Sequence, residues 1–297
     1  MTNTHINEPR ALAYGLAAVL LWSTVATGFK LGLSVMSVTQ LLWLGTGISW
    51  LVFLIYAAAR RQLQPSSGLI KQSLVLGSIN PAAYYLVLFA AYDRLPAHIA
   101  QPLNYTWAIT LALFAIPILG QRLTRTMLAG IVISYLGVLL ILSSAHGSES
   151  EGVSWIGVAL ALGSTLLWAT YWLLNTRWQP PPAGLMFWSF SWGFVLLSML
   201  LLATDTLPAF TTSNLLYGSW VGAVEMGITF ILWQAALRST AQVGRIGQLI
   251  FLSPFLSLLM ISEVLGETIS LTTIGGLATI VLGVAINQRA TSPEQPA

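Results

Sequence analysis

Apolar runs about 20 residues long, separated by short polar or Pro- and Gly-containing breaks, fill most of this 297-residue chain. A helix of roughly that length spans the ~30 Å hydrocarbon core of a bilayer. Charged residues make up 7% of the chain, against about 25% in a soluble domain. We therefore predict an all-α membrane protein with ten transmembrane helices. The ten runs cover residues 11–30, 38–59, 70–92, 97–119, 126–143, 154–175, 184–203, 215–236, 243–263 and 270–288.

The basic residues are distributed unevenly between the two sides of the membrane that these runs define. If the N-terminus is cytoplasmic, only Lys30 and Arg94 of the 12 basic residues fall outside. An excess of Lys and Arg on the cytoplasmic side is the usual pattern, so we predict that both termini are cytoplasmic. Residues 11–29 lack a clear signal-peptide cleavage site and are expected to stay as the first helix. The cytoplasmic basic residues are Arg10, Arg60, Arg61, Lys71, Arg122, Arg125, Arg177, Arg238, Arg245 and Arg289.

The chain repeats itself after about 146 residues. This shift places Leu21-Trp22 on Leu167-Trp168, and a shift of 145 fits the third and eighth runs. Each half holds five runs, an odd number, so the two copies must insert in opposite orientations. Residues 1–147 and 148–297 are therefore predicted to be two inverted five-helix repeats. Such repeats are typical of secondary transporters with a substrate site where the halves meet; a duplicated scaffold without a pathway is the alternative.

Polar and aromatic side chains gather in the fourth run. Gln101 and Tyr105 are four residues apart and share a helix face, with Asn104 and Trp107 at its edge. Lipid offers no hydrogen-bond partner to an amide, a phenol or an indole N–H. We therefore expect these groups to line a pathway for a small molecule. The alternative is that Gln101 and Asn104 join helices by hydrogen bonds.

Aromatic candidates for the same pathway lie in other runs. Trp168 and Tyr171 share a face of the sixth run, and Trp22 is the repeat mate of Trp168 in the first run. Both Trp residues lie well inside their runs, which weakens the interpretation of membrane-interface anchors, whereas ordinary helix packing remains possible. Further candidates are Tyr84 in the third run, Trp233 in the eighth and Gln248 in the ninth.

Glu225 is an acidic residue well inside the eighth run. A charged carboxylate at the bilayer centre costs at least about 2.5 kcal/mol, so an intramembrane carboxylate is a functional candidate by default. Glu225 is expected to bind a substrate amine or to take up a proton. The alternative is that the run is misplaced and that Glu225 lies near the outer surface. Glu263 and Glu267, at the outer end of the ninth run, are expected to be solvated or capping charges.

The sequence offers no constellation typical of a catalytic or cofactor site. It has no Cys, and His5, His98 and His146 lie far apart, without metal-ligand spacing. No Walker A motif and no dinucleotide-binding glycine pattern are present. We therefore expect neither a cofactor nor a bound metal, and an intramembrane enzyme is an unfavoured alternative. The basic loops indicate membrane orientation and no partnership with nucleic acid.

Several short stretches resemble a known family. Leu21-Trp22-Ser23-Thr24, with Ser253-Pro254 and Gly266-Glu267 around the ninth run, is similar to the drug/metabolite transporter superfamily of the EamA type. Asn104-Tyr105-x-Trp107 followed by Gly120-Gln121 resembles the YddG-type exporters of aromatic amino acids. The resemblance implies an exporter in the bacterial plasma membrane that works by alternating access through a central cavity between the repeats. A Pro commonly follows the Trp in that subfamily, whereas Ala108 stands here.

The candidate residues indicate the class of substrate. Aromatic side chains suit apolar or aromatic solutes by stacking and area burial. The amides of Gln101, Asn104 and Gln248 suit amino and carboxyl groups, so an amino acid is the expected small-molecule partner besides the lipid bilayer. The same aromatic residues would bind a cationic compound through cation–π contacts, which keeps multidrug or cationic-metabolite efflux as an alternative.

Overall fold

The computed structural model describes residues 6–119, 123–145, 153–178 and 181–291. All regular structure in these ranges is helical, and ten helical stretches are long and apolar enough to cross a membrane. The prediction of an all-α protein with ten spans is confirmed. The Gly120-Gln121 stretch lies outside the described residues, as do His5, His146 and Arg122. The spans are Glu8–Leu33, Val38–Ala59, Ser67–Arg94, Ala97–Ile118, Arg125–Ser143, Trp155–Trp178, Pro182–Thr204, Thr212–Arg238, Arg245–Leu265 and Leu271–Gln288.

Five of the spans are single α-helices: α3 (Val38–Ala59), α8 (Arg125–Ala145), α9 (Trp155–Trp178), α10 (Pro182–Thr204) and α15 (Leu271–Thr291). The other five are interrupted. The first consists of α1 (Glu8–Ser23) and α2 (Val25–Leu33), and the fourth of α6 (Ala97–Tyr105) and α7 (Trp107–Leu119). The third joins α4 (Ser67–Gly77) and α5 (Tyr84–Arg94) through a π-helical segment, Ser78–Ala83. The eighth joins α11 (Thr212–Ser219) and α12 (Thr229–Arg238) through another, Trp220–Ile228. The ninth joins α13 (Val243–Gly247) and α14 (Ser253–Leu265) through a 3₁₀ turn, Gln248–Leu252.

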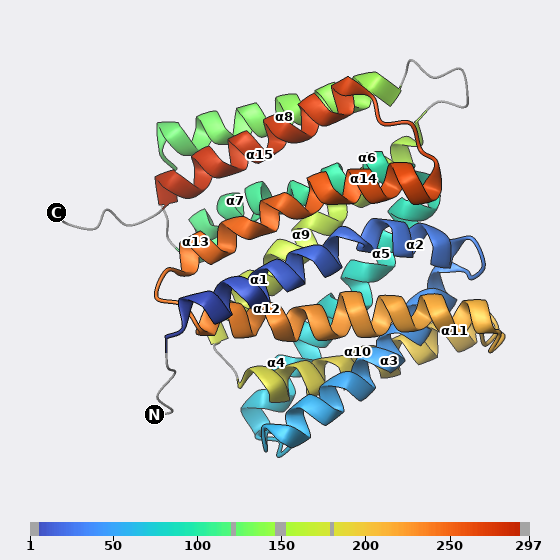
Figure 1. Ribbon diagram of the computed structural model, residues 1–297. Helices are drawn as coiled ribbons and strands as arrows, with labels where there is room; N and C mark the ends of the chain where they lie inside the picture. The colour runs from blue at the N-terminus through green and yellow to red at the C-terminus, as the bar shows by residue number, and fades with distance from the viewer. Residues whose placement is uncertain (1–5, 120–122, 146–152, 179–180, 292–297) are drawn as a thin grey trace. The chain divides into compact units, whose positions relative to one another are not determined.

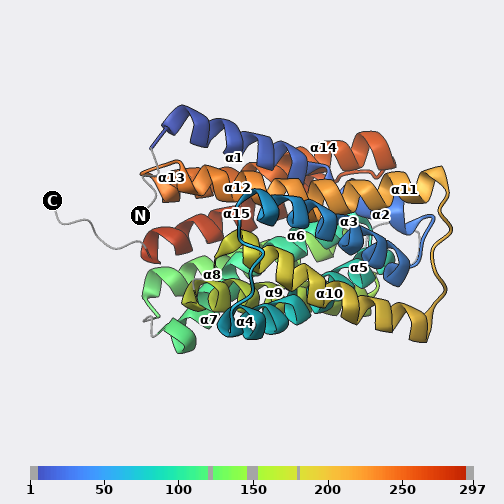
Figure 2. The ribbon, with the colours of Figure 1, turned by 90° about the horizontal axis from the view of Figure 1, so that it is seen from below.

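The contacts divide the chain into two compact units, and each unit draws on both halves of the sequence. Unit 1 comprises Met1–Ala82 and Pro180–Gly266, and unit 2 comprises Ala83–Gln179 and Glu267–Ala297. In unit 1, α1 packs along α12, and α3 packs against α10 and the Trp220–Ile228 segment (Figure 2). The Ser49 hydroxyl links α3 to that segment, because its Oγ lies 2.8 Å from both the Gly45 and the Gly222 carbonyl oxygens.

In unit 2, α9 packs against α5, α6 and α7, and α8 pairs with α15 (Figure 1). Gly130 meets the Gly283 backbone, and its repeat mate Gly276 meets the Gly137 backbone. Gly283 is the repeat mate of Gly137, so the two contacts are reciprocal: each glycine of the first copy meets the mate of the other. A two-fold relation between two copies requires such reciprocal contacts. The α8–α15 pair therefore has the geometry of two copies in opposite orientations.

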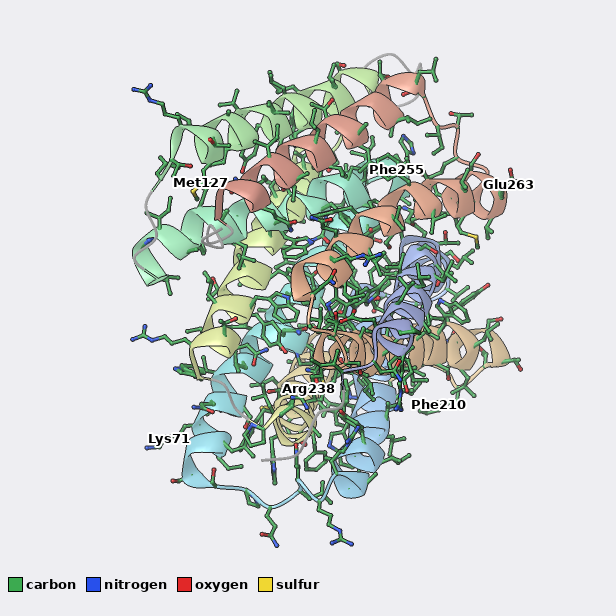
Figure 3. All side chains as sticks on the ribbon, turned by 60° about the vertical axis from the view of Figure 1, so that its left-hand side comes forward. Lys71, Met127, Phe210, Arg238, Phe255 and Glu263 are labelled. Atoms are coloured by element: carbon green, nitrogen blue, oxygen red, sulfur yellow. The ribbon has the colours of Figure 1, made fainter. Side chains whose placement is uncertain are left out.

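Glu263 and Glu267 lie where the sequence predicted solvated or capping charges. Glu263 is exposed near the end of α14 (Figure 3). The Glu267 carboxylate accepts hydrogen bonds from the backbone N–H groups of Ala97 and His98 at the start of α6. The prediction is confirmed for both residues.

Candidate functional site

Trp168 is the centre of an aromatic cluster in unit 2. Its ring stacks on Tyr84 with 4.5 Å between centroids and on Tyr171 at 5.7 Å. Trp107 and Trp172 meet it edge-on at 6.5 and 5.9 Å. Trp168 and Tyr171 come from one face of α9, Tyr84 from the first turn of α5 and Trp107 from the first residue of α7. The predicted residues from both halves of the sequence are thus brought together within one unit.

Asn104 is fixed beside this cluster by two hydrogen bonds. Its Nδ2 donates to Ser164 Oγ at 2.9 Å, and the Tyr84 hydroxyl donates to its Oδ1 at 3.4 Å. Ser164 in turn donates to the Ala161 carbonyl oxygen at 2.7 Å. Because Tyr84 both stacks on Trp168 and bonds to Asn104, it couples the aromatic cluster to the amide. The alternative of a helix-joining Asn104 is therefore also observed: the amide links α6 to α9.

Ser164 is a member of this site that sequence reasoning missed. It is fully buried and lies four residues before Trp168, on the same face of α9. That spacing indicates a shared face with Trp168. A serine hydroxyl in a membrane span most often bonds to its own helix, however, so its presence alone does not predict a binding site. Ser164 does both, since its Oγ is a donor within α9 and an acceptor for Asn104.

The fourth span is interrupted in the middle of the predicted motif. α6 ends at Tyr105, and α7 begins at Trp107. At the break, the Thr106 N–H donates to the Leu103 carbonyl oxygen, three residues back, at 3.2 Å, which is not the i to i−4 bond of an α-helix. The Thr106 hydroxyl donates to the Leu103 carbonyl oxygen at 2.7 Å and satisfies part of the interrupted backbone. Asn104 and Trp107 therefore flank a helix break inside the span.

Gln101 and Tyr105 lie on α6 with the spacing that the sequence predicted. Gln101 is 4% exposed, and its Oε1 has no hydrogen-bond partner among the described residues. An amide oxygen buried without a partner costs about 1–3 kcal/mol. A bound molecule that donates a hydrogen bond to this oxygen would remove that cost and bind more tightly. Tyr105 is half-buried.

Unit 1 holds a second aromatic cluster. Trp22 meets Phe230 edge-on at 5.7 Å and lies 5.5 Å from Trp233. Trp233 packs with Ala18 and Val19 of α1 in a buried core. Phe230 was not predicted, because a single Phe in an apolar span carries no distinguishing signal.

Glu225 and Gln248, also in unit 1, have different surroundings. Glu225 is buried, at 8% exposed, and lies in the π-helical middle of the span Thr212–Arg238. Its position favours the interpretation of an intramembrane carboxylate over that of a surface charge. Gln248 begins the 3₁₀ turn of the ninth span, and its side chain is exposed. Across the described ranges, no group of three His, Asp or Glu side chains is placed to hold a metal ion.

Comparison with known proteins gives the family. The EamA-like transporter family matches the chain twice, over residues 9–143 and 155–288. The chain belongs to this family. EamA-like proteins are transporters, so the chain is a multi-pass membrane transporter and not an enzyme. The two matches correspond to the two five-helix repeats, which the odd number of spans in each half places in opposite orientations.

Several curated EamA relatives are distant. An uncharacterized transporter of Clostridium kluyveri is 28% identical over 60% of this chain, and the aligned region spans 60% of that relative's length. A probable amino-acid metabolite efflux pump of Salmonella typhimurium is 28% identical over 72% of this chain and 76% of its own. The aromatic amino acid exporter YddG of Ancylobacter novellus is 25% identical over 86% of this chain and 89% of its own. A solved crystal structure with 21% identity matches at a TM-score of 0.68, covering 96% of this chain and all of that one, and shows the fold alone.

Proposed function

We propose that this EamA-family transporter exports amino acids, aromatic or otherwise apolar, by alternating access through a central cavity between the two repeats. The observation that carries the proposal is the group formed by Trp168, Tyr84 and Asn104, where buried aromatic rings adjoin a positioned amide. Aromatic rings gain about 0.5–1.5 kcal/mol per well-oriented pair beyond area burial. The amide of Asn104 and the acceptor of Gln101 would bind the polar end of the same solute.

The names of two relatives support the same substrate class. One is a probable amino-acid metabolite efflux pump and another is an aromatic amino acid exporter. Because the sequence identities are only 28% and 25%, the individual substrate is inferred from the side chains of this chain. The aromatic cluster favours tryptophan, phenylalanine and tyrosine over small or charged amino acids.

Export of cationic compounds is the second candidate function. The observation that favours it is the buried Glu225 in unit 1. A carboxylate within a membrane span is suited to pairing with a cation, and the aromatic rings add cation–π contacts. An anionic solute without an amine does not need Glu225 in this role.

A transport assay with purified protein in liposomes separates the two candidates. We expect labelled tryptophan to move without ATP and a panel of unlabelled aromatic amino acids to compete with it. Transport of cationic dyes without transport of any amino acid would contradict the proposal. Trp168→Ala should reduce tryptophan transport strongly. Trp43→Ala is the matched control, because Trp43 also stacks on a ring, Phe194 at 5.5 Å, and hydrogen-bonds to a serine, but it lies outside the cluster.

We further propose an orientation with both termini in the cytoplasm of a bacterial cell, which the distribution of Lys and Arg supports. The chain contains no Cys, so single introduced cysteines report sidedness without background. Leu63→Cys, in the loop after α3, should be shielded from a membrane-impermeant thiol reagent in whole cells. Leu207→Cys, in the loop after α10, should react. The reverse pattern would invert the topology.

A further inference from the structure

Glu267 makes an unusual set of contacts at the start of the helix that carries Gln101 and Asn104. Its Oε1 accepts from the Ala97 N–H at 2.9 Å, and its Oε2 accepts from the His98 N–H at 3.0 Å. The same Oε2 lies 2.6 Å from His98 Nδ1. The two side chains are 17% and 16% exposed. One carboxylate thus satisfies two unpaired N–H groups of the first turn of α6 and pairs with a titratable ring.

The local sequence explains how Glu267 reaches α6. Gly266 ends α14 in the left-handed region, at φ 67° and ψ 17°, a conformation that residues other than Gly adopt at a cost. The chain turns there and places Glu267 four residues before the start of α15. The Glu267 side chain therefore fastens the link between α14 and α15 to the start of α6, and the contact lies within unit 2.

Few other charged groups lie at this end of unit 2. The helices packed against α6 are α5, α8, α9 and α15. Arg125 and Arg177 stand at the opposite ends of α8 and α9, and α15 has no charged residue before Arg289. At the near end, α5 finishes with Tyr92, Asp93 and Arg94; the last two are exposed and lie 3.6 Å apart in an ion pair. Among the charged groups described, His98 is the one that acts on the Glu267 carboxylate.

Burial works to raise the pKa of Glu267, but the His98 side chain and the two backbone N–H groups outweigh it and hold the pKa below its usual value. These contacts therefore favour the ionised form of the Glu267 carboxylate. Imidazole is the kind of side-chain group whose charge changes within the physiological pH range. When the ring is protonated, the contact is an ion pair, and when it is neutral, only a hydrogen bond to the carboxylate remains.

The pair belongs to only one copy of the repeat. A shift of 146 residues takes Glu267 back to Gln121 and His98 forward to Gly244. Neither a glutamine nor a glycine titrates. Because the two copies insert in opposite orientations, a titratable pair in one copy exists at only one face of the membrane. By the charge distribution this is the outer face.

We propose that Glu267 and His98 are positioning residues that hold α6, and with it Gln101 and Asn104, in the geometry that binds substrate, and that they make transport depend on the pH at the membrane face where α6 begins. The proposal rests on the proposed transport function. Protonation of His98 tightens the pair and favours the binding geometry. Loss of the proton loosens the first turn of α6 and lowers the affinity for substrate, while the aromatic cluster on α9 stays in place.

Inside-out membrane vesicles, in which export is measured as uptake, test the dependence on each face separately. With the cytoplasmic face held constant, we expect the KM for tryptophan to rise about fivefold as the pH inside the vesicle goes from about 5.5 to about 8, the low end of coupling between sites. His98→Gln and Glu267→Gln should both flatten this profile. Glu263→Gln, which removes an exposed carboxylate one turn earlier, is the matched control and should keep it. An unchanged profile in His98→Gln, or the same profile produced from the cytoplasmic face, would overturn the proposal.

Amide hydrogen exchange provides a readout that does not require transport. The N–H groups of Ala97 and His98 donate to Glu267, so a peptide covering residues 96–105 should exchange faster in Glu267→Gln than in the parent protein at the same pH. The parent should also lose protection, relative to Glu267→Gln, as the pH rises. Equal exchange in the two proteins would refute the contact between Glu267 and the first turn of α6. If the parent transports no amino acid but this difference in exchange is found, the proposed function is refuted, whereas the contact of Glu267 with α6 is supported.

Discussion

Replacing Ser164 by alanine tests whether Asn104 acts as a positioned recognition group or only as a link between helices. Ser164 Oγ is the acceptor for Asn104 Nδ2 at 2.9 Å, in a fully buried position. Side-chain hydrogen bonds between membrane helices contribute about 0.6 kcal/mol on average and at most about 1.7. The substitution removes one oxygen atom and leaves all ring contacts of Trp168 untouched. We therefore expect the free energy of unfolding to fall by about 1 kcal/mol, a loss that leaves the protein folded.

The effect on transport should be of similar size in free energy and is measured as a rise in KM. Without Ser164, the Asn104 amide keeps only the longer bond from the Tyr84 hydroxyl, at 3.4 Å, and is free to rotate away from the substrate. A loss of 0.6–1.7 kcal/mol corresponds to a KM about three to eighteen times higher. The maximal rate should change less, because the helices that move in the cycle are not altered.

Ser134→Ala is the matched control. Ser134 is buried in unit 2 and donates to the Ile280 carbonyl oxygen at 3.0 Å, so it also joins two helices, α8 and α15. We expect a similar loss of stability and an unchanged KM. The assay is initial-rate uptake of labelled tryptophan into liposomes, beside thermal unfolding of the detergent-solubilised protein. If both variants raise KM equally, or if Ser164→Ala lowers stability without changing KM, Asn104 is a structural link and the reasoning fails.

Three further predictions concern stability and are checked by thermal unfolding. Gly276→Ala should lower the free energy of unfolding by about 1–3 kcal/mol, because the added methyl would lie 2.6 Å from Ile141 Cγ1, whereas Gly275→Ala, with nothing within 4 Å, should be neutral or slightly stabilising. Gly266→Ala should cost about 1 kcal/mol, since alanine is strained at a φ of 67°; a neutral result would refute the argument from the turn. Hydrogen bonds from Ser37, the Thr206 N–H and Thr39 lower the pKa of Asp205, and the pKa of Glu267 is lowered too. A lowered folded-state pKa gives stability that is complete above the unfolded value, about 4, and is lost as the pH falls through the folded value. Acid should therefore destabilise the parent below about pH 4, and Asp205→Asn less so; a parent whose unfolding is independent of pH there would contradict this.

The sequence could predict the spans because a bilayer imposes a strict length and composition on any helix that crosses it. The predicted third run, 70–92, became Ser67–Arg94, and the predicted eighth, 215–236, became Thr212–Arg238. The differences lie at the ends, where helices extend beyond the apolar core into polar surroundings. The interruptions inside the spans were not predicted in this detail. Within the π-helical segment Trp220–Ile228, Gly222 lies against Gly45 and Ile48 of α3, and hydropathy alone does not predict such packing between helices.

The candidate residues were predictable as types, whereas their partners were not. An amide and four aromatic side chains in apolar runs are conspicuous, and the helical spacing of Trp168 and Tyr171 placed these two on one face. The bond from Asn104 to Ser164 joins residues 60 apart in the sequence, and the pair of His98 with Glu267 joins residues 169 apart. Such pairs depend on which helices become neighbours. Spacing within one helix cannot predict them.

The two aromatic clusters show how a symmetric frame holds asymmetric chemistry. The shift of 146 residues relates Trp22 to Trp168, whereas the shift of 145 that fits the third and eighth runs relates Tyr84 to Thr229. Phe230, which Trp22 meets edge-on in unit 1, is therefore the residue after the counterpart of Tyr84, and its contact differs from the stack of Tyr84 on Trp168 in unit 2. Thr229 has no ring, and its hydroxyl donates to the Val224 carbonyl oxygen of its own span. The residue that corresponds to Asn104 is Ile250, which packs beside the unit 1 cluster. The two copies therefore share the Trp residue, whereas the ring of Tyr84 and its hydrogen bond to the Asn104 amide in unit 2 have no equivalent at the corresponding positions of unit 1. The proposed substrate, with one aromatic and one polar end, therefore matches the side chains of the unit 2 cluster better than those of the unit 1 cluster.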